Sequence, residues 1–319
     1  MLKKFLGLVL ALLACLVLSR LDLAEIQLHI GTLGQGKFLI LCLLQLVTMG
    51  LLALQWQNIL GTIVDRPSYW QALAMNSYGN IIDGITPGSK VGGELSRIRS
   101  IRRRFKLDYG RASLALGLQK TISISSLLLL YLASLAYYCL APGPGPGRKF
   151  LAWNLALILG LALLALLAYK KSAWLKSRLL AFAWARKNMA RLESYLRDYR
   201  TYLAQLLASS SQLGKNLGLG LLIWLLYPVK MYLILGAMKA QLGFPLVVAI
   251  SYISYILAML PLLPGSLGSF ESGLAYLLML QGLPLGLGLA VSIIFRFISF
   301  WFEMGLSGLI LIFDRIEEL

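Results

Sequence analysis

Long runs of apolar residues constrain this chain more than any other feature. Six runs approach the roughly 20 residues that an α-helix needs to cross the hydrocarbon core of a bilayer. Charged residues make up only 13% of the 319 positions, whereas a soluble domain carries about a quarter. We therefore expect an all-α polytopic membrane protein, a single transmembrane domain over residues 1–319. Its six spanning helices are expected at about 4–20, 37–60, 112–140, 150–169, 215–238 and 285–312.

Positive charge is concentrated between these runs. The net charge of +17 does not indicate nucleic-acid binding, because lysine and arginine gather in segments 97–111 and 170–215, the positive-inside pattern. Placing both segments in the cytoplasm puts the N- and C-termini there too. We expect a multi-pass protein of the cell (inner or cytoplasmic) membrane, with a cytoplasmic amphipathic helix at about 172–213. There Leu192, Leu196 and Tyr199 recur at helical spacing with arginines between them.

Cysteine and histidine indicate neither a disulfide framework nor a metal site. Cys15, Cys42 and Cys139 each lie inside an apolar run, and no CxxC occurs. His29 falls in what we expect to be a short polar loop after the first helix. We therefore predict no cofactor and no bound metal. The basic, apolar N-terminus is expected to be a retained first helix rather than a cleaved signal peptide.

A short motif occurs twice. Residues 87–94 read PGSKVGGE and residues 264–271 read PGSLGSFE, so both have Pro-Gly-Ser followed five residues later by Glu. Downstream, KTIS begins at Lys120 and RFIS begins at Arg296, at matching distances to within one residue. The ordered matches indicate an internal duplication, with repeat 1 at about 68–140 and repeat 2 at about 244–312.

Each Pro-Gly-Ser marks a break between two short helices. Proline suits the first turn of a helix and disfavours helical geometry in the residue before it. The flanking segments are too short or too polar to span a bilayer, so we predict two re-entrant helical hairpins. Under the charge-based topology they enter from opposite faces, which makes an inverted repeat typical of transporters. The predicted tips are Pro87, Gly88, Ser89, Pro264, Gly265 and Ser266.

Ionised residues inside these segments are functional candidates, because each costs about 3 kcal/mol at the bilayer centre on insertion scales. In one interpretation their role is only structural, and they stabilise the hairpins through ion pairs of Glu94 with Lys90 or Arg97 and of Glu271 with Arg296. In the other, they line a polar cavity where Lys120 and Arg296 attract an anionic head group. Lys230 is expected to snorkel or to pair internally. The candidate residues are Glu94, Arg97, Lys120, Glu271, Arg296 and Glu303.

Two stretches carry a family resemblance. Residues 260–271, LPLLPGSLGSFE, are followed by Gly282 and Arg296, and an earlier set comprises Asn80, residues 86–88, residues 93–94 and Arg97. Together they resemble the lysylphosphatidylglycerol synthase transmembrane-region family, in which a Pro-Gly-Gly-x-Gly-x-x-Glu segment is typical. Here Ser266 stands in place of the second glycine.

The resemblance implies a bacterial or archaeal membrane protein that moves, or helps to move, an amphipathic lipid between leaflets. Some relatives carry a soluble aminoacyl-transferase domain. We expect none here, because the last spanning helix ends close to Leu319. Lysyl transfer to lipid is therefore not carried over. We expect an amphipathic lipid, anionic or aminoacylated, as the substrate; an aminoacylated phospholipid, a polyprenyl-phosphate-linked sugar and another lipid all stay open.

Three functions remain open from the sequence. The first is a lipid flippase, a transporter rather than an enzyme, with membrane lipids as its partners. The second is a non-transporting accessory that scaffolds a lipid-modifying synthase or glycosyltransferase, through residues 172–213. The third is an enzyme acting on a lipid phosphate, which would need a cluster of His, Asp or Cys side chains; the sequence shows none.

Overall fold

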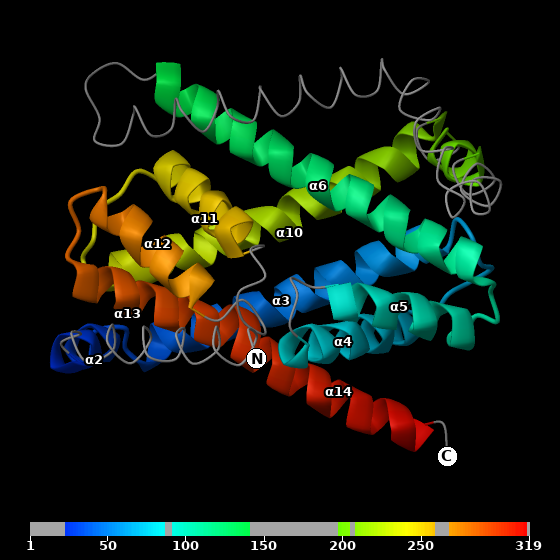
Figure 1. Cartoon of the computed structure of the whole chain (residues 1–319), viewed down its shortest axis with the longest axis horizontal. Helices are drawn as coiled ribbons and strands as arrows, with labels where there is room; N and C mark the ends of the chain where they lie inside the picture. Colours follow the sequence, from blue (N-terminus) through cyan, green and yellow to red (C-terminus); the bar gives the residue numbers. More distant parts are fainter. Residues whose placement is uncertain (1–22, 87–90, 141–196, 205–207, 259–267, 318–319) are drawn as a thin grey trace, which may run out of the picture.

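The fold is known from a computed structural model that describes residues 23–86, 91–140, 197–204, 208–258 and 268–317. The elements assigned within these ranges are helices, and the long ones run across the view of Figure 1 and cross one another at an angle. They are α2 (Leu23–Gly31), α3 (Gln35–Leu60), α4 (Tyr69–Ile85), α5 (Val91–Arg104), α6 (Tyr109–Leu140), α10 (Ser210–Ala237), α11 (Phe244–Ala258), α12 (Ser269–Met279), α13 (Leu285–Arg296), the π-helix η2 (Phe297–Phe302) and α14 (Glu303–Glu317).

Four of the described segments are long and apolar enough to cross a membrane. They are α3, α6, α10 and the continuous run of α13, η2 and α14. They match the helices predicted at 37–60, 112–140, 215–238 and 285–312, although α10 begins earlier, with Ser209 as its N-cap. The helices predicted at 4–20 and 150–169 lie outside the described residues. So does most of the amphipathic helix predicted at 172–213, of which residues 197–204 are helical.

One local prediction is wrong. The segment after the first predicted helix was expected to be a polar loop, but Leu23–Gly31 forms helix α2. Its sequence, LAEIQLHIG, contains neither proline nor an internal glycine, so nothing breaks a helix there. Packing against α13 supplies tertiary contacts, which stabilise short helices more than propensity does.

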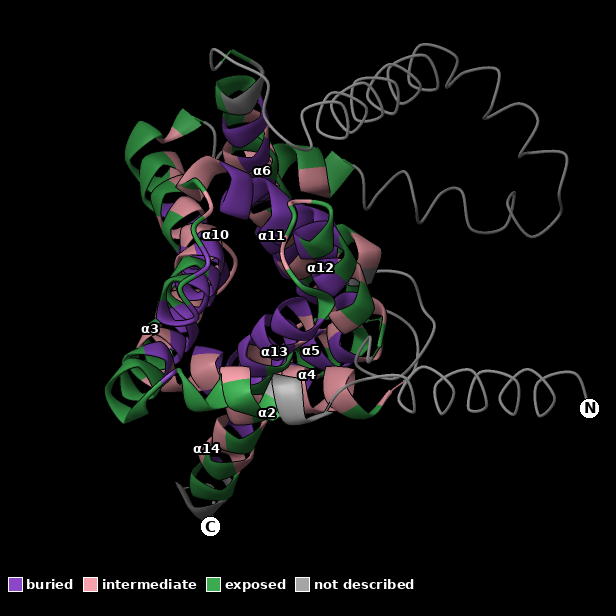
Figure 2. Ribbon diagram, turned by 90° about the vertical axis from the view of Figure 1, so that its left-hand side faces the viewer, coloured by how far each residue is buried: buried purple, intermediate pink, exposed green. Residues whose placement is uncertain are grey.

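The spanning helices have apolar outer faces, and their inner faces combine apolar side chains with a few buried polar ones. In α3, Gln45 and Gln55 are buried, whereas Leu39, Leu43 and Val47 are 60%, 52% and 50% exposed. Figure 2 shows buried residues on the inward sides of the bundle and exposed ones outside. A soluble helix would place charged and polar residues on its outer face, so the apolar outer face fits a lipid-facing surface, where polar groups must be satisfied internally.

Two pairs of short helices lie within the bundle: α4 packs against α5, and α11 packs against α12. At about 1.5 Å per residue, even α4, with 17 residues, is only about 26 Å long. That is less than the roughly 30 Å of a hydrocarbon core. The residues that join each pair, 87–90 and 259–267, contain the predicted hairpin tips and lie outside the described residues.

The helix contacts of the two halves correspond. In the first half α3 packs on α4, α4 on α5 and α5 on α6; in the second, α10 packs on α11, α11 on α12 and α12 on α13. The contacts between halves also correspond, because α6 meets α11 while α14 meets α4, and α3 meets α10. Exchanging the two halves therefore maps each of these contacts onto another of them, whereas the contact of α2 with α13 has no counterpart among the described elements.

A buried aromatic cluster fills the second half of the bundle. Tyr252 lies edge-on to Trp224, and Tyr255 lies edge-on to Phe270. Phe270 of α12 stacks on Phe295 of α13 at a centroid distance of 5.6 Å. Such pairs are worth about 0.5–1.5 kcal/mol each beyond the area they bury. They hold α12 against α13 and so position the charged residues at the ends of those two helices.

Candidate functional site

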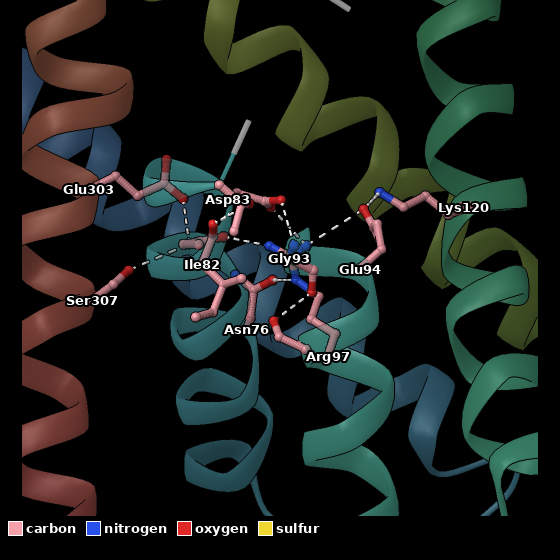
Figure 3. A network of polar contacts seen from close by, with 12 residues as sticks. Asn76, Ile82, Asp83, Gly93, Glu94, Arg97, Lys120, Glu303 and Ser307 are labelled. Atoms are coloured by element: carbon pink, nitrogen blue, oxygen red, sulfur yellow. Dashed lines mark hydrogen bonds and ion pairs between the residues drawn. The ribbon is translucent and has the colours of Figure 1, made fainter. Parts of the chain in front are cut away.

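Arg97 of α5 is the centre of a polar network between α4 and α5 (Figure 3). Its Nη1 donates to Asp83 Oδ2 at 3.1 Å, its Nη2 to Asn80 Oδ1 at 2.7 Å, and its Nε to Asn76 Oδ1 at 3.2 Å. The three acceptors follow one another at helical spacing and so share one face of α4. A planar guanidinium suits this arrangement, because its donors point in fixed, diverging directions.

Two glycines allow α4 and α5 to approach this closely. A Cβ at Gly79 would lie 2.4 Å from Arg97 Nε, and a Cβ at Gly93 would lie 2.1 Å from the Asp83 carboxyl carbon. The Gly93 N–H also donates to Asp83 Oδ1 at 3.0 Å. The network therefore depends on backbone positions that carry no side chain.

Glu94 joins this network to α6. It lies in the first turn of α5, where a carboxylate is favoured by the helix dipole. Its Oε1 lies 3.5 Å from Arg97 Nη1 and forms an ion pair with the Lys120 ammonium. Its Oε2 is buried and has no hydrogen-bond partner among the described residues. The Lys120 side chain is 41% exposed and that of Glu94 19%, so the pair lies at the edge of the bundle.

On the other side, the network reaches α14, α3 and α10 through Glu303. This carboxylate accepts from Asn80 Nδ2 at 2.8 Å and from Gln45 Nε2 at 2.9 Å. Gln45 in turn accepts a hydrogen bond from the Lys230 ammonium. Lys230 is fully buried, donates to Thr48 Oγ1 at 3.3 Å and lies 4.5 Å from the ring centroid of Tyr227. One connected set of polar contacts thus runs from α6 to α10.

The connected residues extend from the edge of the bundle at Lys120 to its buried interior at Lys230, and their formal charges balance. Gln45 is the eleventh of the 26 residues of α3, about 15 Å from the start of that helix at 1.5 Å per residue. Formal balance lowers the cost of keeping ionised groups away from water. The three cations are Lys120, Arg97 and Lys230, and the three carboxylates are Glu94, Asp83 and Glu303.

A second, smaller charge cluster joins α12 to α13. Glu271 Oε2 accepts the Gly268 N–H at 2.8 Å, and Glu271 Oε1 lies 3.3 Å from Arg296 Nε. The Arg296 guanidinium lies 4.2 Å from the ring centroid of Phe300 and 5.5 Å from that of Phe270. Its Nη2 is buried and has no hydrogen-bond partner among the described residues. The π-helix η2 follows immediately, so Arg296 faces α12 while Glu303 faces α3 and α4.

The two clusters fall at corresponding positions of the sequence motif. In each, a glutamate from the first turn of the second short helix pairs with a cation on the next helix: Glu94 with Lys120, and Glu271 with Arg296. The predicted contacts of Glu94 with Arg97 and of Glu271 with Arg296 are present. Lys120 and Arg296 belong to different ion pairs, and the polar cavity expected between the two hairpins stays a prediction. Lys90 and the six predicted tip residues lie outside the described residues.

Several residues of the network were not selected from the sequence. Asn76, Gln45 and Thr48 are uncharged, and single amides or hydroxyls in apolar helices attract less notice than charges. Arg104 and Asp314 were also missed, although they form a bidentate ion pair between the ends of α5 and α14. The sequence signal that could have found them is polar residues recurring at helical spacing on one face of an otherwise apolar helix. In the described ranges, no group of three or more His, Cys, Asp or Glu residues could hold a metal ion.

Comparisons with known proteins place these features in a family. The sequence model described as "Lysylphosphatidylglycerol synthase TM region" matches residues 4–307. A "UPF0104 membrane protein" from Methanothermobacter thermautotrophicus is 27% identical over 115 residues, which are 36% of this chain and 32% of that protein. The match thus spans about a third of the relative's length. No solved structure matches significantly.

Proposed function

Because the chain belongs to the lysylphosphatidylglycerol synthase transmembrane-region family, we propose that it moves an amphipathic lipid between the two leaflets of the cell membrane. The lipid is anionic or aminoacylated. The family description relates the chain to lipid metabolism at a membrane. The proposal of transport, rather than of lipid chemistry or scaffolding, rests on the charge network.

The observation that carries this proposal is the position of the Glu94–Lys120 ion pair. The Lys120 side chain, on the spanning helix α6, is 41% exposed, yet the Glu94 carboxylate also contacts the buried Arg97 network. A polar site that is reached from the side admits a head group while the acyl chains stay in the bilayer. A pathway for a water-soluble solute would need no such sideways access.

Translocation requires a substitute for water around the head group. An ionised side chain at the bilayer centre costs about 3 kcal/mol on insertion scales and more in simulations, and the same kind of desolvation cost opposes the spontaneous movement of a charged head group. The amide, guanidinium and carboxylate groups around Arg97 and Glu303 offer donors and acceptors at that depth. In the second half, Arg296 provides a further guanidinium with an unused donor among the described residues.

We further propose that the helix pairs α4–α5 and α11–α12 are re-entrant hairpins in an inverted repeat. Their lengths support this, since none of the four helices exceeds 17 residues. The exchange symmetry of the helix contacts and the corresponding ion pairs Glu94–Lys120 and Glu271–Arg296 also support it. The last turns of α5 and α12 point to opposite ends of the bundle in Figure 1.

The cytoplasmic face is proposed to be the end of the bundle where α5 and α14 finish. The Arg104–Asp314 ion pair joins these two helix ends, and Arg102, Arg103 and Arg104 form the last turn of α5. The start of α10 lies at the same end in Figure 1, to the right. Positive residues mark the cytoplasmic side of membrane proteins, so the C-terminus and, with six spans, the N-terminus lie in the cytoplasm.

The test is translocation of a fluorescent phosphatidylglycerol in proteoliposomes, read as protection of the label from dithionite. We expect wild-type protein to move the label and both Lys120→Met and Arg296→Gln to lose most of that movement. Arg103→Gln is the matched control, because it removes an exposed positive charge outside the network. Full activity in both charge variants, with their folds intact, would contradict the proposal. An inactive wild-type chain that co-purifies with a lipid-modifying enzyme would instead support the scaffold alternative.

A further inference from the structure

The carboxylates of the central network differ in whether both of their oxygens accept hydrogen bonds. Asp83 accepts from Gly93 N–H on one oxygen and from Arg97 on the other. Glu303 likewise accepts on both oxygens, from Asn80 and Gln45. In Glu94, by contrast, both cations share Oε1. Among the buried side-chain atoms that the structure describes, Glu94 Oε2 is the carboxylate oxygen without a hydrogen-bond partner.

Charge balance limits what the network can accept. Its three cations already match its three carboxylates. A lipid phosphate bound there would leave an excess negative charge in a region of low dielectric, which is costly. This formal count takes both lysines and the arginine in their charged forms. The excess can therefore be removed by protonating one carboxylate.

We propose that Glu94 is that carboxylate and that the protein carries one proton with each anionic lipid. The lipid phosphate replaces Glu94 at the Lys120 ammonium, so one ion pair breaks and another forms. A proton from the aqueous phase then binds the Glu94 carboxylate at Oε2. The loaded site has the same net charge as the empty one. On release at the other leaflet, the proton leaves and the Glu94–Lys120 pair forms again.

The surroundings of Glu94 favour this exchange. Lys120 faces it from α6, Asp83 lies across from it on α4, and Arg97 is one turn away on α5 itself. When a phosphate binds Lys120, the charges left around Glu94 among the described residues are the shared Arg97 and the Asp83 carboxylate, and the phosphate adds to them. Nearby negative charge and loss of the counter-ion both favour the protonated acid. Exposure of Lys120 gives the phosphate access to the pair it must open.

This inference rests on the proposed function and adds a coupling ion to it. A lipid of charge −1 that moves with one proton crosses without net charge. Its distribution between leaflets then follows the pH gradient, by a factor of ten for each pH unit, and does not follow the membrane potential. Without the proton, the distribution of the same lipid between the leaflets would depend on the membrane potential and not on the pH gradient.

The experiment uses full-length protein in phosphatidylcholine vesicles with a trace of fluorescent phosphatidylglycerol. Either a pH gradient, alkaline inside, or a potassium diffusion potential is imposed, and dithionite reports the fraction of label in the outer leaflet. We expect about tenfold inward enrichment for one pH unit and none for the potential alone. A distribution that follows the potential and not the pH gradient would overturn proton coupling while leaving lipid transport intact. No movement of the label under any condition would contradict the proposed function itself.

Substitutions at Glu94 test whether this residue carries the proton. We expect Glu94→Gln to lose the response to pH, whereas Glu94→Asp retains it because it keeps a titratable group. Asp108→Asn is the control, since this exposed residue caps the start of α6 through the Arg111 N–H at 2.7 Å and contacts no part of the network. Glu94→Gln protein that still moves the label and still responds fully to the pH gradient would show that another group carries the proton.

Discussion

Replacing Gly93 with alanine tests whether the close approach of α4 and α5 builds the network. The added Cβ would lie 2.1 Å from both the carboxyl carbon and Oδ1 of Asp83, far inside van der Waals contact. These atoms are not the end of a flexible chain, because Asp83 is held by Arg97 and by the Gly93 N–H. The helices must therefore separate or the carboxylate must turn away.

The size of the effect follows from three terms. Overpacking costs about 1–3 kcal/mol, and losing the hydrogen bond from Gly93 to a charged carboxylate costs about 1.5–3 kcal/mol. Alanine restores about 1 kcal/mol through its higher helix propensity. We expect a net loss of about 3 kcal/mol in the free energy of unfolding, with a parallel loss of lipid movement because Arg97 and Glu94 lose their positions.

Equilibrium unfolding in mixed detergent micelles, followed by tryptophan fluorescence, measures this loss. Gly218→Ala is the matched control, since Gly218 lies inside α10 and a Cβ there meets nothing within 4 Å. That variant should be as stable as wild type or up to about 1 kcal/mol more stable. Equal stability of the Gly93 and Gly218 variants would refute the argument that the α4–α5 contact is set by missing side chains.

Three other outcomes are expected. Arg97→Lys should lose about 2 kcal/mol of unfolding free energy, because an ammonium cannot replace three diverging donors; the same micelle assay measures it. Arg104→Met should destabilise by about 3 kcal/mol, because it leaves the buried Asp314 carboxylate without its bidentate partner; the double change Arg104→Met with Asp314→Leu should recover much of that loss. In a cysteine-free background, a cysteine at Lys106 should react only from the cytoplasmic side and one at Lys239 only from outside; the same sidedness for both would contradict the topology.

The spanning helices could be predicted because their signal is strong and local. The runs that became α3, α6 and α10 are nearly uncharged over lengths that match a bilayer. Helix ends in polar sequence were predicted less accurately. Helix α10 begins at Ser210 rather than at about 215, because capping by a serine, not hydropathy, sets its start. Helix α2 was missed because its stability comes from packing against α13, a contact that no local pattern reveals.

The candidate site was predictable in its charges but not in its connections. Glu94, Lys120, Glu271 and Arg296 stood out because ionised residues are rare in apolar segments. The sequence does not specify that Glu94 reaches Lys120 on another helix, because that contact depends on how α5 packs on α6. Nor could it place Lys120 and Arg296 in different clusters, which follows from the separation of the two helix pairs.

The neutral members of the network show a further limit of sequence patterns. Gln45 links Glu303 to Lys230, yet nothing in the sequence distinguishes it from the other three glutamines of the 26-residue helix α3. It matters because its side chain points into the bundle, where it contacts both Glu303 of α14 and Lys230 of α10. Buried amides of this kind satisfy charged groups without adding a charge.

The most direct measurement is photo-crosslinking with a phosphatidylglycerol whose head group carries a diazirine, followed by peptide mapping of the adducts. If the head group passes through the central network, adducts will lie on α5 and α6 beside Glu94 and Lys120, and Lys120→Met will lose them. Adducts restricted to the two ends of the bundle, unchanged in that variant, would contradict the claim that a head group enters this network.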